Sequence, residues 1–318
     1  MNMQYTAVIR TLGTAGLKYQ KLLDSLVSQT IPPEEILVYI AEGYEIPPET
    51  VGTEKYIFVK KGMVAQRALR YDEVKTEYIL FLDDDLYLPA DIIEKMFGLL
   101  VKYGADVVSP DIYPNSERPF KQRFMMAASG RMRARYRDRH WGYKVMRTAG
   151  YSYNAHPVKD AYWSQTNAGA CFLCRKTDFL SIHFEEELWM DRQKYSIGDD
   201  QVMYYKMYKS GLKELTVYNT GILHLDAGHN TSKEKERSLI YADFVYKTIF
   251  WHRFIYLPEK SVMMRLVDIL CIGYAFGFAL VISLIKGRFD IFRIKLDAMK
   301  EGRKFLKSEE YRKLPLII

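Results

Sequence analysis

The sequence predicts an α/β protein with a mostly parallel sheet flanked by helices. Short apolar runs alternate with helical patterns through the first third of the chain, an order that is typical of parallel sheets covered on both faces. The chain has 318 residues, of which 48% are hydrophobic. That is enough for one large domain with its own core, or for one domain with an appendage.

The first third of the chain supplies the elements of this sheet. Strands are expected at residues 5–9, 36–40, 56–59, 78–82 and 106–109. Helices are expected at residues 63–71 and 90–102, and before them where Leu22, Leu23, Leu26 and Val27 share one face, ahead of Pro32 and Pro33. Ligands collect at the carboxyl ends of parallel strands, so residues 10–14, 42–44 and 83–85 are predicted to line one pocket.

Three consecutive aspartates, Asp83, Asp84 and Asp85, follow the strand expected at residues 78–82. Side chains alternate along an extended segment, so we expect Asp83 and Asp85 on one side and Asp84 on the other. Two carboxylates on one side repel unless a cation lies between them, which favours Mg²⁺ or Mn²⁺. The alternative is an acidic loop in which one aspartate caps the helix that Pro89 opens.

The charge of the chain is concentrated in two segments. The formal net charge is +7, but residues 131–147 carry seven Lys or Arg and one Asp, and residues 286–318 carry ten and five acids. The remainder therefore sums to 7 − 11 = −4. Basic segments on a mildly acidic body favour anionic partners at particular surfaces.

The first basic segment interleaves arginines with Tyr136, Trp141 and Tyr143. Such a pattern could bind nucleic acid, anionic lipid or a phosphorylated acceptor, or it could be a solvated loop. No nucleic-acid-binding module surrounds it, so we expect no nucleic acid partner.

The three cysteines give no disulfide framework, and a reducing compartment is the default. The Cys171-x-x-Cys174 pair lies in an apolar strand, which favours a place in the core over metal or redox chemistry. Residues 1–10 lack the apolar core of a secretory signal, so the N-terminal body is expected in the cytoplasm.

A second acidic cluster follows Gly198. Asp199 and Asp200 are expected to open a helix that runs to Lys209 and ends at Ser210-Gly211. Capping that helix is an adequate alternative role for one of the two. Short strands are expected at 215–217 and 222–223, and the second delivers His224, whose alternative role is a hydrogen-bonded core or surface residue.

These features form an ordered set along the chain. They are the strand at 5–9, Glu42 after the second sheet strand, Arg67, Leu82 before the three aspartates, the small residues at 167–170, the pair Asp199-Asp200, and His224. The set resembles the family 2 glycosyltransferases of the GT-A fold, over about residues 4–255. The run LDDDLYLP, with an acidic pair and a His 24 positions later, is similar to the bacterial galactofuranosyltransferase branch. The family usually has Asp in place of Glu42 and a Glu-Asp pair in place of Asp199-Asp200.

The resemblance implies an inverting transfer of a sugar from a nucleoside diphosphate sugar, with UDP favoured, to a hydroxyl of a glycan or lipid-linked glycan. Such a transfer needs a cation for the leaving diphosphate and one base for the acceptor hydroxyl. We expect Mg²⁺ or Mn²⁺ on Asp83, Asp85 and His224. Asp200 is the expected base, and Asp199 is expected to orient the acceptor or cap the helix.

Further residues are assigned to the two substrates. Expected nucleotide-sugar contacts are Arg10, Thr11, Glu42, Arg67, Asp83 and Asp84. Expected acceptor contacts are Trp163, Asn167, Gly169 and Trp189, with core packing as the alternative for each tryptophan. A non-catalytic, membrane-bound glycan- or nucleotide-binding protein on a degenerate GT-A fold is the alternative function. A phosphatase or nucleotidyltransferase would need a nucleophile or a glycine-rich phosphate loop, and the sequence has neither.

We expect a catalytic domain at residues 1–255 and hydrophobic and basic helices at residues 256–318. The uncharged stretch 269–285 is near the lower limit for a spanning helix, and Gly273-x-x-x-Gly277 within it would allow close helix packing. The basic tail belongs in the cytoplasm by the positive-inside rule, as does a domain that uses nucleotide sugars, so one crossing cannot satisfy both. We therefore expect burial in the cytoplasmic membrane interface, against anionic lipid, or packing in a homodimer. A buried core helix in a soluble oligomer is the alternative.

Overall fold

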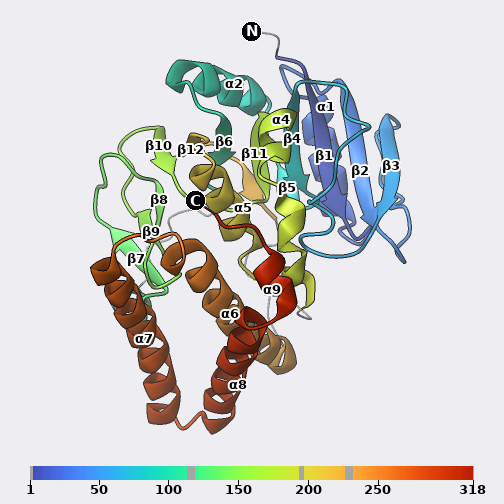
Figure 1. Ribbon diagram of the computed structural model, residues 1–318. Coiled ribbons are helices and arrows are strands. Elements are labelled where there is room, and N and C mark those ends of the chain that lie inside the picture. Colours follow the sequence, from blue (N-terminus) through green and yellow to red (C-terminus); the bar gives the residue numbers. More distant parts are fainter. Residues whose placement is uncertain (1–2, 113–118, 193–196, 226–231, 318) are drawn as a thin grey trace.

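The computed structural model describes residues 3–112, 119–192, 197–225 and 232–317 (Figure 1). An eight-stranded sheet forms its centre, in the order β10-β12-β6-β11-β4-β1-β2-β3. Its strands are β1 (Tyr5–Thr11), β2 (Glu35–Ala41), β3 (Glu54–Val59), β4 (Tyr78–Asp83), β6 (Val107–Pro110), β10 (Ala161–Ser164), β11 (Cys171–Arg175) and β12 (Glu214–Val217). Strands β1 to β4 are parallel, and β11 runs antiparallel to both of its neighbours. The α/β class with a mostly parallel sheet is thus confirmed.

Both faces of the sheet are buried, as parallel strands require. Helices α1 (Leu17–Val27) and α2 (Ile92–Tyr103) cover one face. Helices α4 (Lys176–Ser181), α5 (Asp199–Lys209) and α6 (Lys233–Phe250) lie on the other. Alternate residues of β1 serve the two cores, because Ala7 and Ile9 pack with α1 and α2 while Val8 packs on the side of α5.

Two expectations from the sequence are settled by burial and backbone geometry. Cys171 and Cys174 are fully buried in β11, so the Cys-x-x-Cys pair is part of the core. The helix expected at residues 63–71 is wrong, because the segment forms turns. Its backbone N–H groups at Val64 and Ala65 donate to the Asp191 carboxylate, at 3.0 and 2.8 Å, instead of to a helical ladder.

A small second sheet occupies most of the stretch between β6 and β11. It follows α3 (Phe120–Ala128) and has the order β7-β9-β8, from β7 (Met132–Arg135), β8 (Tyr143–Val145) and β9 (Tyr151–Asn154). A further short ribbon pairs β5 (Leu86–Tyr87) with β13 (Leu223–His224), antiparallel. The ribbon places His224 opposite Leu86, directly after the three aspartates.

The C-terminal segment is helical and extends from the body (Figure 1). Helix α6 continues through a π-helical turn (Trp251–Tyr256) to α7 (Val262–Ile285), α8 (Phe289–Leu306) and α9 (Glu309–Lys313). Helix α8 packs against α6. Within the described residues, α7 is the one helix long and apolar enough to cross a membrane, and 28% of its most apolar window is buried in this chain. It is therefore not a core helix of the single chain.

Candidate active site

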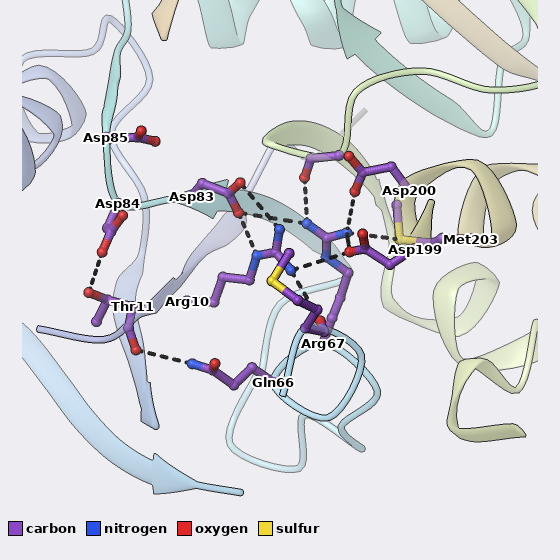
Figure 2. A network of polar contacts seen from close by, with 12 residues as sticks. Arg10, Thr11, Gln66, Arg67, Asp83, Asp84, Asp85, Asp199, Asp200 and Met203 are labelled. Carbon is purple, nitrogen blue, oxygen red and sulfur yellow. Dashed lines mark hydrogen bonds and ion pairs between the residues drawn. The ribbon is translucent and has the colours of Figure 1, made fainter. Parts of the chain in front are cut away.

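The carboxyl ends of β1 and β4 place Arg10 beside Asp83, because these two residues are paired in the sheet register. The Arg10 guanidinium binds both oxygens of the Asp83 carboxylate, with Nε to Oδ1 at 2.5 Å and Nη2 to Oδ2 at 3.2 Å (Figure 2). Burial alone would raise the pKa of Asp83, but the adjacent guanidinium lowers it below its ordinary value. The predicted meeting of residues 10–14 with the aspartates is confirmed at this pair.

Arg67 connects this strand end to helix α5. Its side chain is 2% exposed, and Nη1 donates to Asp200 Oδ1 at 2.8 Å while Nη2 donates to the Gly169 carbonyl at 2.8 Å. The same guanidinium lies 3.5 Å from Asp199 Oδ2 and 3.7 Å from Asp83 Oδ1. A buried charge is stable only when it is paired and hydrogen-bonded. The turn that carries Arg67 is therefore tied to three carboxylates.

The cluster contains two guanidinium groups and three carboxylates, Asp83, Asp199 and Asp200, so its formal charge is +2 − 3 = −1. Asp199 has the longest ion pairs, 3.5 Å to Arg67 and 3.7 Å to Arg10. Burial, followed by the neighbouring Asp200 charge, raises the pKa of Asp199 to about 6. Asp199 therefore takes up a proton more readily than an ordinary aspartate.

Asp199 and Asp200 differ in access although they are neighbours in α5. The Asp199 side chain is 7% exposed and that of Asp200 is 36% exposed. The expected capping role is not observed, since Gly198 is the N-cap residue and receives no side-chain cap. Gly198 has φ +85° and lies against the Tyr246 ring, so a side chain there would be strained and would collide with the ring.

Asp84 and Asp85 lie in a turn because β4 ends at Asp83. The strand alternation expected through Asp85 therefore stops at Asp83, and each aspartate has a different partner. Asp84 accepts a hydrogen bond from the Thr11 hydroxyl, and burial raises its pKa to about 6. Asp85 lies apart from the arginine cluster and makes no contact with it (Figure 2). Its Oδ2 lies 3.1 Å from His224 Nε2.

The residues predicted to hold a metal are brought together only in part. Among residues 3–112, 119–192, 197–225 and 232–317, no group of three His, Cys, Asp or Glu side chains is arranged to hold a metal ion. Asp85 and His224 are in contact, whereas both oxygens of Asp83 bind Arg10. The Asp85 carboxylate fits Mg²⁺ or Mn²⁺ that takes further ligands from substrate phosphates and water, and the His224 imidazole suits the transition metal Mn²⁺ better than Mg²⁺.

A cavity of about 540 Å³ opens beside Asp200. Asn167 and Ala168 line it, as the predicted acceptor stretch requires. Four tyrosines also line it: Tyr143, which the sequence singled out in the first basic segment, and Tyr151, Tyr153 and Tyr246, which sequence reasoning missed. The signal in the sequence was the alternation in Tyr151-Ser152-Tyr153, which puts two rings on one face of a strand.

Gly169 follows Ala168, which lines the cavity, and lies against the Arg67–Asp200 ion pair. A Cβ atom on this residue would be 2.1 Å from Asp200 Oδ1 and 2.7 Å from Arg67 Nη1. Only glycine leaves room for this ion pair in its present position.

The remaining predicted residues lie elsewhere. Trp189 is 6% exposed, donates to Glu187 Oε2 at 2.7 Å and packs on Phe305, so it belongs to the core rather than to an acceptor platform. Trp163 is in β10 and contacts the Tyr103 ring edge to face. Glu42 is exposed just after β2. Gln66, which sequence reasoning missed, donates to the Thr11 carbonyl at 3.0 Å and helps to fix the β1 end.

Part of the chain matches a known protein family. Residues 55–178 match the model of a family described as glycosyl transferase family 2. No curated protein matches the sequence. A similar solved structure is that of GalNAc-T7 with UDP, GalNAc and Mn²⁺, at 12% identity and a TM-score of 0.48, covering 87% of this chain and 55% of that chain. This chain thus spans about half the length of that protein.

Proposed function

We propose that this chain is an inverting glycosyltransferase of the family 2 type, which moves a sugar from a nucleoside diphosphate sugar to a glycan hydroxyl. The observation that carries the proposal is the Asp200 carboxylate, held by the buried Arg67 at 2.8 Å on the wall of the 540 Å³ cavity. The family match of residues 55–178 supports the reaction class. The segment matched includes β4 and its three aspartates.

Donor binding is assigned to the strand ends of β1 and β4. Arg10 would contact the diphosphate, the buried Arg67 would help to position the nucleotide, and Thr11 with Asp84 would face the nucleoside or the donor sugar. Glu42, at the same edge, is the proposed ribose or base contact. Asp85 and His224 would hold Mg²⁺ or Mn²⁺, with Asp83 joining them if Arg10 releases it. The bound cation would supply neutralisation of the charge that develops on the leaving diphosphate.

Proton removal is assigned to Asp200. An inverting displacement needs one base that takes the proton of the acceptor hydroxyl as the new glycosidic bond forms and the diphosphate leaves. Asp200 borders the cavity, whereas Asp199 is almost fully buried between two arginines. Access therefore favours Asp200, and Asp199 becomes a positioning residue for Arg10 and Arg67.

Acceptor binding is assigned to the tyrosine-lined cavity. Sugars present C–H groups on their faces and hydroxyls at their edges, and tyrosine rings offer an apolar face with a polar tip for each. The acceptor hydroxyl would approach Asp200 past Asn167 and Gly169. A glycan, free or lipid-linked, is the acceptor class that suits this lining.

Helix α7 supports a membrane location. Its exposed apolar residues include Val262, Met263, Leu266 and Leu270. We place the protein on the cytoplasmic side of a membrane, where nucleotide sugars are available, with α7 in the interface. Alternatively, this face could pack in a homodimer through Gly273 and Gly277. A Cβ atom added at either glycine would have no atom from outside the helix within 4 Å.

The test is nucleotide release from a panel of nucleoside diphosphate sugars, with Mg²⁺, Mn²⁺ or a chelator. Asp200→Asn should lower turnover about 10²- to 10⁴-fold, and Asp85→Ala should abolish the metal response. Asp91→Asn, an exposed change at the start of α2, is the matched control. Full turnover in Asp200→Asn would refute the base assignment. Tight nucleotide binding with no release from any sugar would favour the non-catalytic binding protein.

A further inference from the structure

A second cavity, of about 710 Å³, lies outside the candidate active site. The small sheet, the end of α5 and residues 254–260 form its walls. Six cationic side chains line it: Arg133, Arg135, Lys144, Arg147, Lys209 and Lys260. Glu259 is the one acidic residue among the lining side chains. We call this cavity the basic pocket.

The small sheet separates the basic pocket from the tyrosine-lined cavity. On β9, Tyr151 and Tyr153 line the cavity beside Asp200, while Ser152 lines the basic pocket. On β8, Tyr143 and Lys144 divide in the same way. Neighbouring residues of a strand point to opposite faces. In the Arg/Tyr-rich segment, Tyr143 and Arg131 thus line the tyrosine-lined cavity, whereas the cations Arg133, Arg135 and Lys144 line the basic pocket.

Among the residues that the structure describes, most cations of the basic pocket have no carboxylate partner. Arg135 pairs with Asp138, and Arg147 pairs with Glu259 at 3.5 Å and with Asp268. In the part of the chain that the structure describes, no carboxylate oxygen lies within 4.0 Å of the other four, Arg133, Lys144, Lys209 and Lys260. Clustered cations repel one another, and a multiply charged anion relieves that repulsion.

The exposed apolar face of α7 begins at the edge of the basic pocket. Lys260 lines the pocket, and Val262 and Met263, 74% and 70% exposed, are the first residues of the helix. Arg147 joins the two features, because its guanidinium pairs with the buried Asp268 of α7. A cationic pocket continuous with an apolar helix face matches a molecule that has a phosphate head group and hydrocarbon chains.

We propose that the basic pocket binds the phosphate head group of an anionic membrane lipid, whose chains lie along the exposed face of α7. The proposal rests on the membrane location proposed above, but not on glycosyl transfer. For the first basic segment, residues 131–147, the sequence left anionic lipid and a phosphorylated acceptor as possible partners. The proposal selects anionic lipid.

Binding of the full chain to vesicles tests the proposal. The vesicles are phosphatidylcholine alone or equal parts of phosphatidylcholine and phosphatidylglycerol. The double variant Lys209→Glu/Lys260→Glu should lose about tenfold or more in affinity for the anionic vesicles, because each basic residue near an anionic surface contributes measurably to binding. Lys209→Arg/Lys260→Arg should bind like the unaltered protein.

A charge-matched control lies on α8, where Arg303 and Lys304 are exposed. Arg303→Glu/Lys304→Glu should weaken vesicle binding less than the pocket variant does. Equal losses in the two variants would mean diffuse attraction by a basic surface and would overturn the pocket assignment.

Glycerol phosphate, a soluble analogue of the head group, distinguishes the contribution of the basic pocket to binding from that of helix α7. Leu266→Asp/Leu270→Asp on α7 should weaken binding to vesicles and leave glycerol phosphate binding intact. If glycerol phosphate binds the unaltered protein but not the pocket variant, while anionic vesicles bind no better than neutral ones, the ligand is a soluble phosphate and the lipid assignment is wrong. Nucleotide release with a soluble acceptor should be unchanged in the pocket variant. Failure of the lipid proposal can therefore be distinguished from failure of the glycosyltransferase proposal.

Discussion

Gly169→Ala is the sharpest test of the candidate site, because a single methyl group would enter the Arg67–Asp200 ion pair. The new Cβ would lie 2.1 Å from Asp200 Oδ1, whereas ordinary van der Waals contact begins at 3.4 Å. Asp200 must therefore move by about 3.4 − 2.1 = 1.3 Å. The ion pair is 2.8 Å long and the limit for such a pair is 4.0 Å. A shift of this size directed away from Arg67 lengthens the pair to about 2.8 + 1.3 = 4.1 Å and breaks it.

Arg67 has little room to relieve the clash, although its Nη1 would itself lie 2.7 Å from the new Cβ. Its side chain is 2% exposed, and its Nη2 donates to the carbonyl of Gly169 itself. We therefore expect Gly169→Ala to lower the free energy of unfolding by about 1–3 kcal/mol, the usual cost of overpacking. Because the displaced side chain is the proposed base, turnover should fall by about 10²- to 10⁴-fold.

Urea unfolding and metal-dependent nucleotide release measure the two effects. Gly98→Ala is the control, since Gly98 is exposed in α2 and a Cβ atom added there would have no neighbour within 4 Å. This control should raise stability by about 0.5–1 kcal/mol and leave turnover unchanged. If Gly169→Ala behaves like Gly98→Ala, the packing of Gly169 against Asp200 is wrong. A variant that is less stable but fully active would support the packing of Gly169 against Asp200 and refute the assignment of Asp200 as the base.

Three further substitutions should change the free energy of unfolding. Two alter the cluster itself, and the third alters the anchor of the turn that carries Arg67. Arg67→Met leaves three carboxylates with one guanidinium and should cost about 3–5 kcal/mol in urea unfolding; a cost under about 1 kcal/mol would contradict the network. Asp199 has a folded pKa of about 6 against an ordinary value of 3.8, so its proton stabilises the folded state at low pH and that stabilisation is lost as pH rises through 6. From pH 4 to 8 the free energy of unfolding should fall by up to about 3 kcal/mol more in the unaltered protein than in Asp199→Asn, because the raised pKa of Asp84 causes a fall in both; parallel profiles would refute the role of Asp199. Asp191→Ala removes the acceptor for Val64 N–H and Ala65 N–H and should cost about 1–3 kcal/mol, and an unchanged unfolding midpoint would show that this anchor is dispensable.

Local patterns in the sequence predicted the elements that depend on local physics. Strands β1, β2 and β4 were visible as apolar runs, and α5 was visible because Gly198 and Ser210-Gly211 mark its ends. The rule that parallel strands present ligands at their carboxyl ends placed Arg10 near Asp83. The structure bears out that part of the site as a register pair.

Distant contacts decided the parts that sequence reasoning missed. The turns at residues 63–71 are fixed by Asp191, more than a hundred positions away, which no periodicity could reveal. Asp85 left the expected face because β4 ends two residues earlier, and strand ends are set by pairing with a neighbour. The tyrosine-lined cavity required knowing that β8 and β9 are adjacent.

The small sheet places head-group binding on one face and binding of the acceptor hydroxyl on the other. The tyrosines and Asp200 lie on one side, and the cations of the basic pocket lie on the other. A head group bound beside Lys144 is therefore divided from the proposed base by the backbone of β8 and β9. A lipid held in the basic pocket would anchor the protein at the membrane, while a different molecule presents its hydroxyl to Asp200. Lipid binding should accordingly raise the local concentration of membrane-borne acceptors without entering the chemical step.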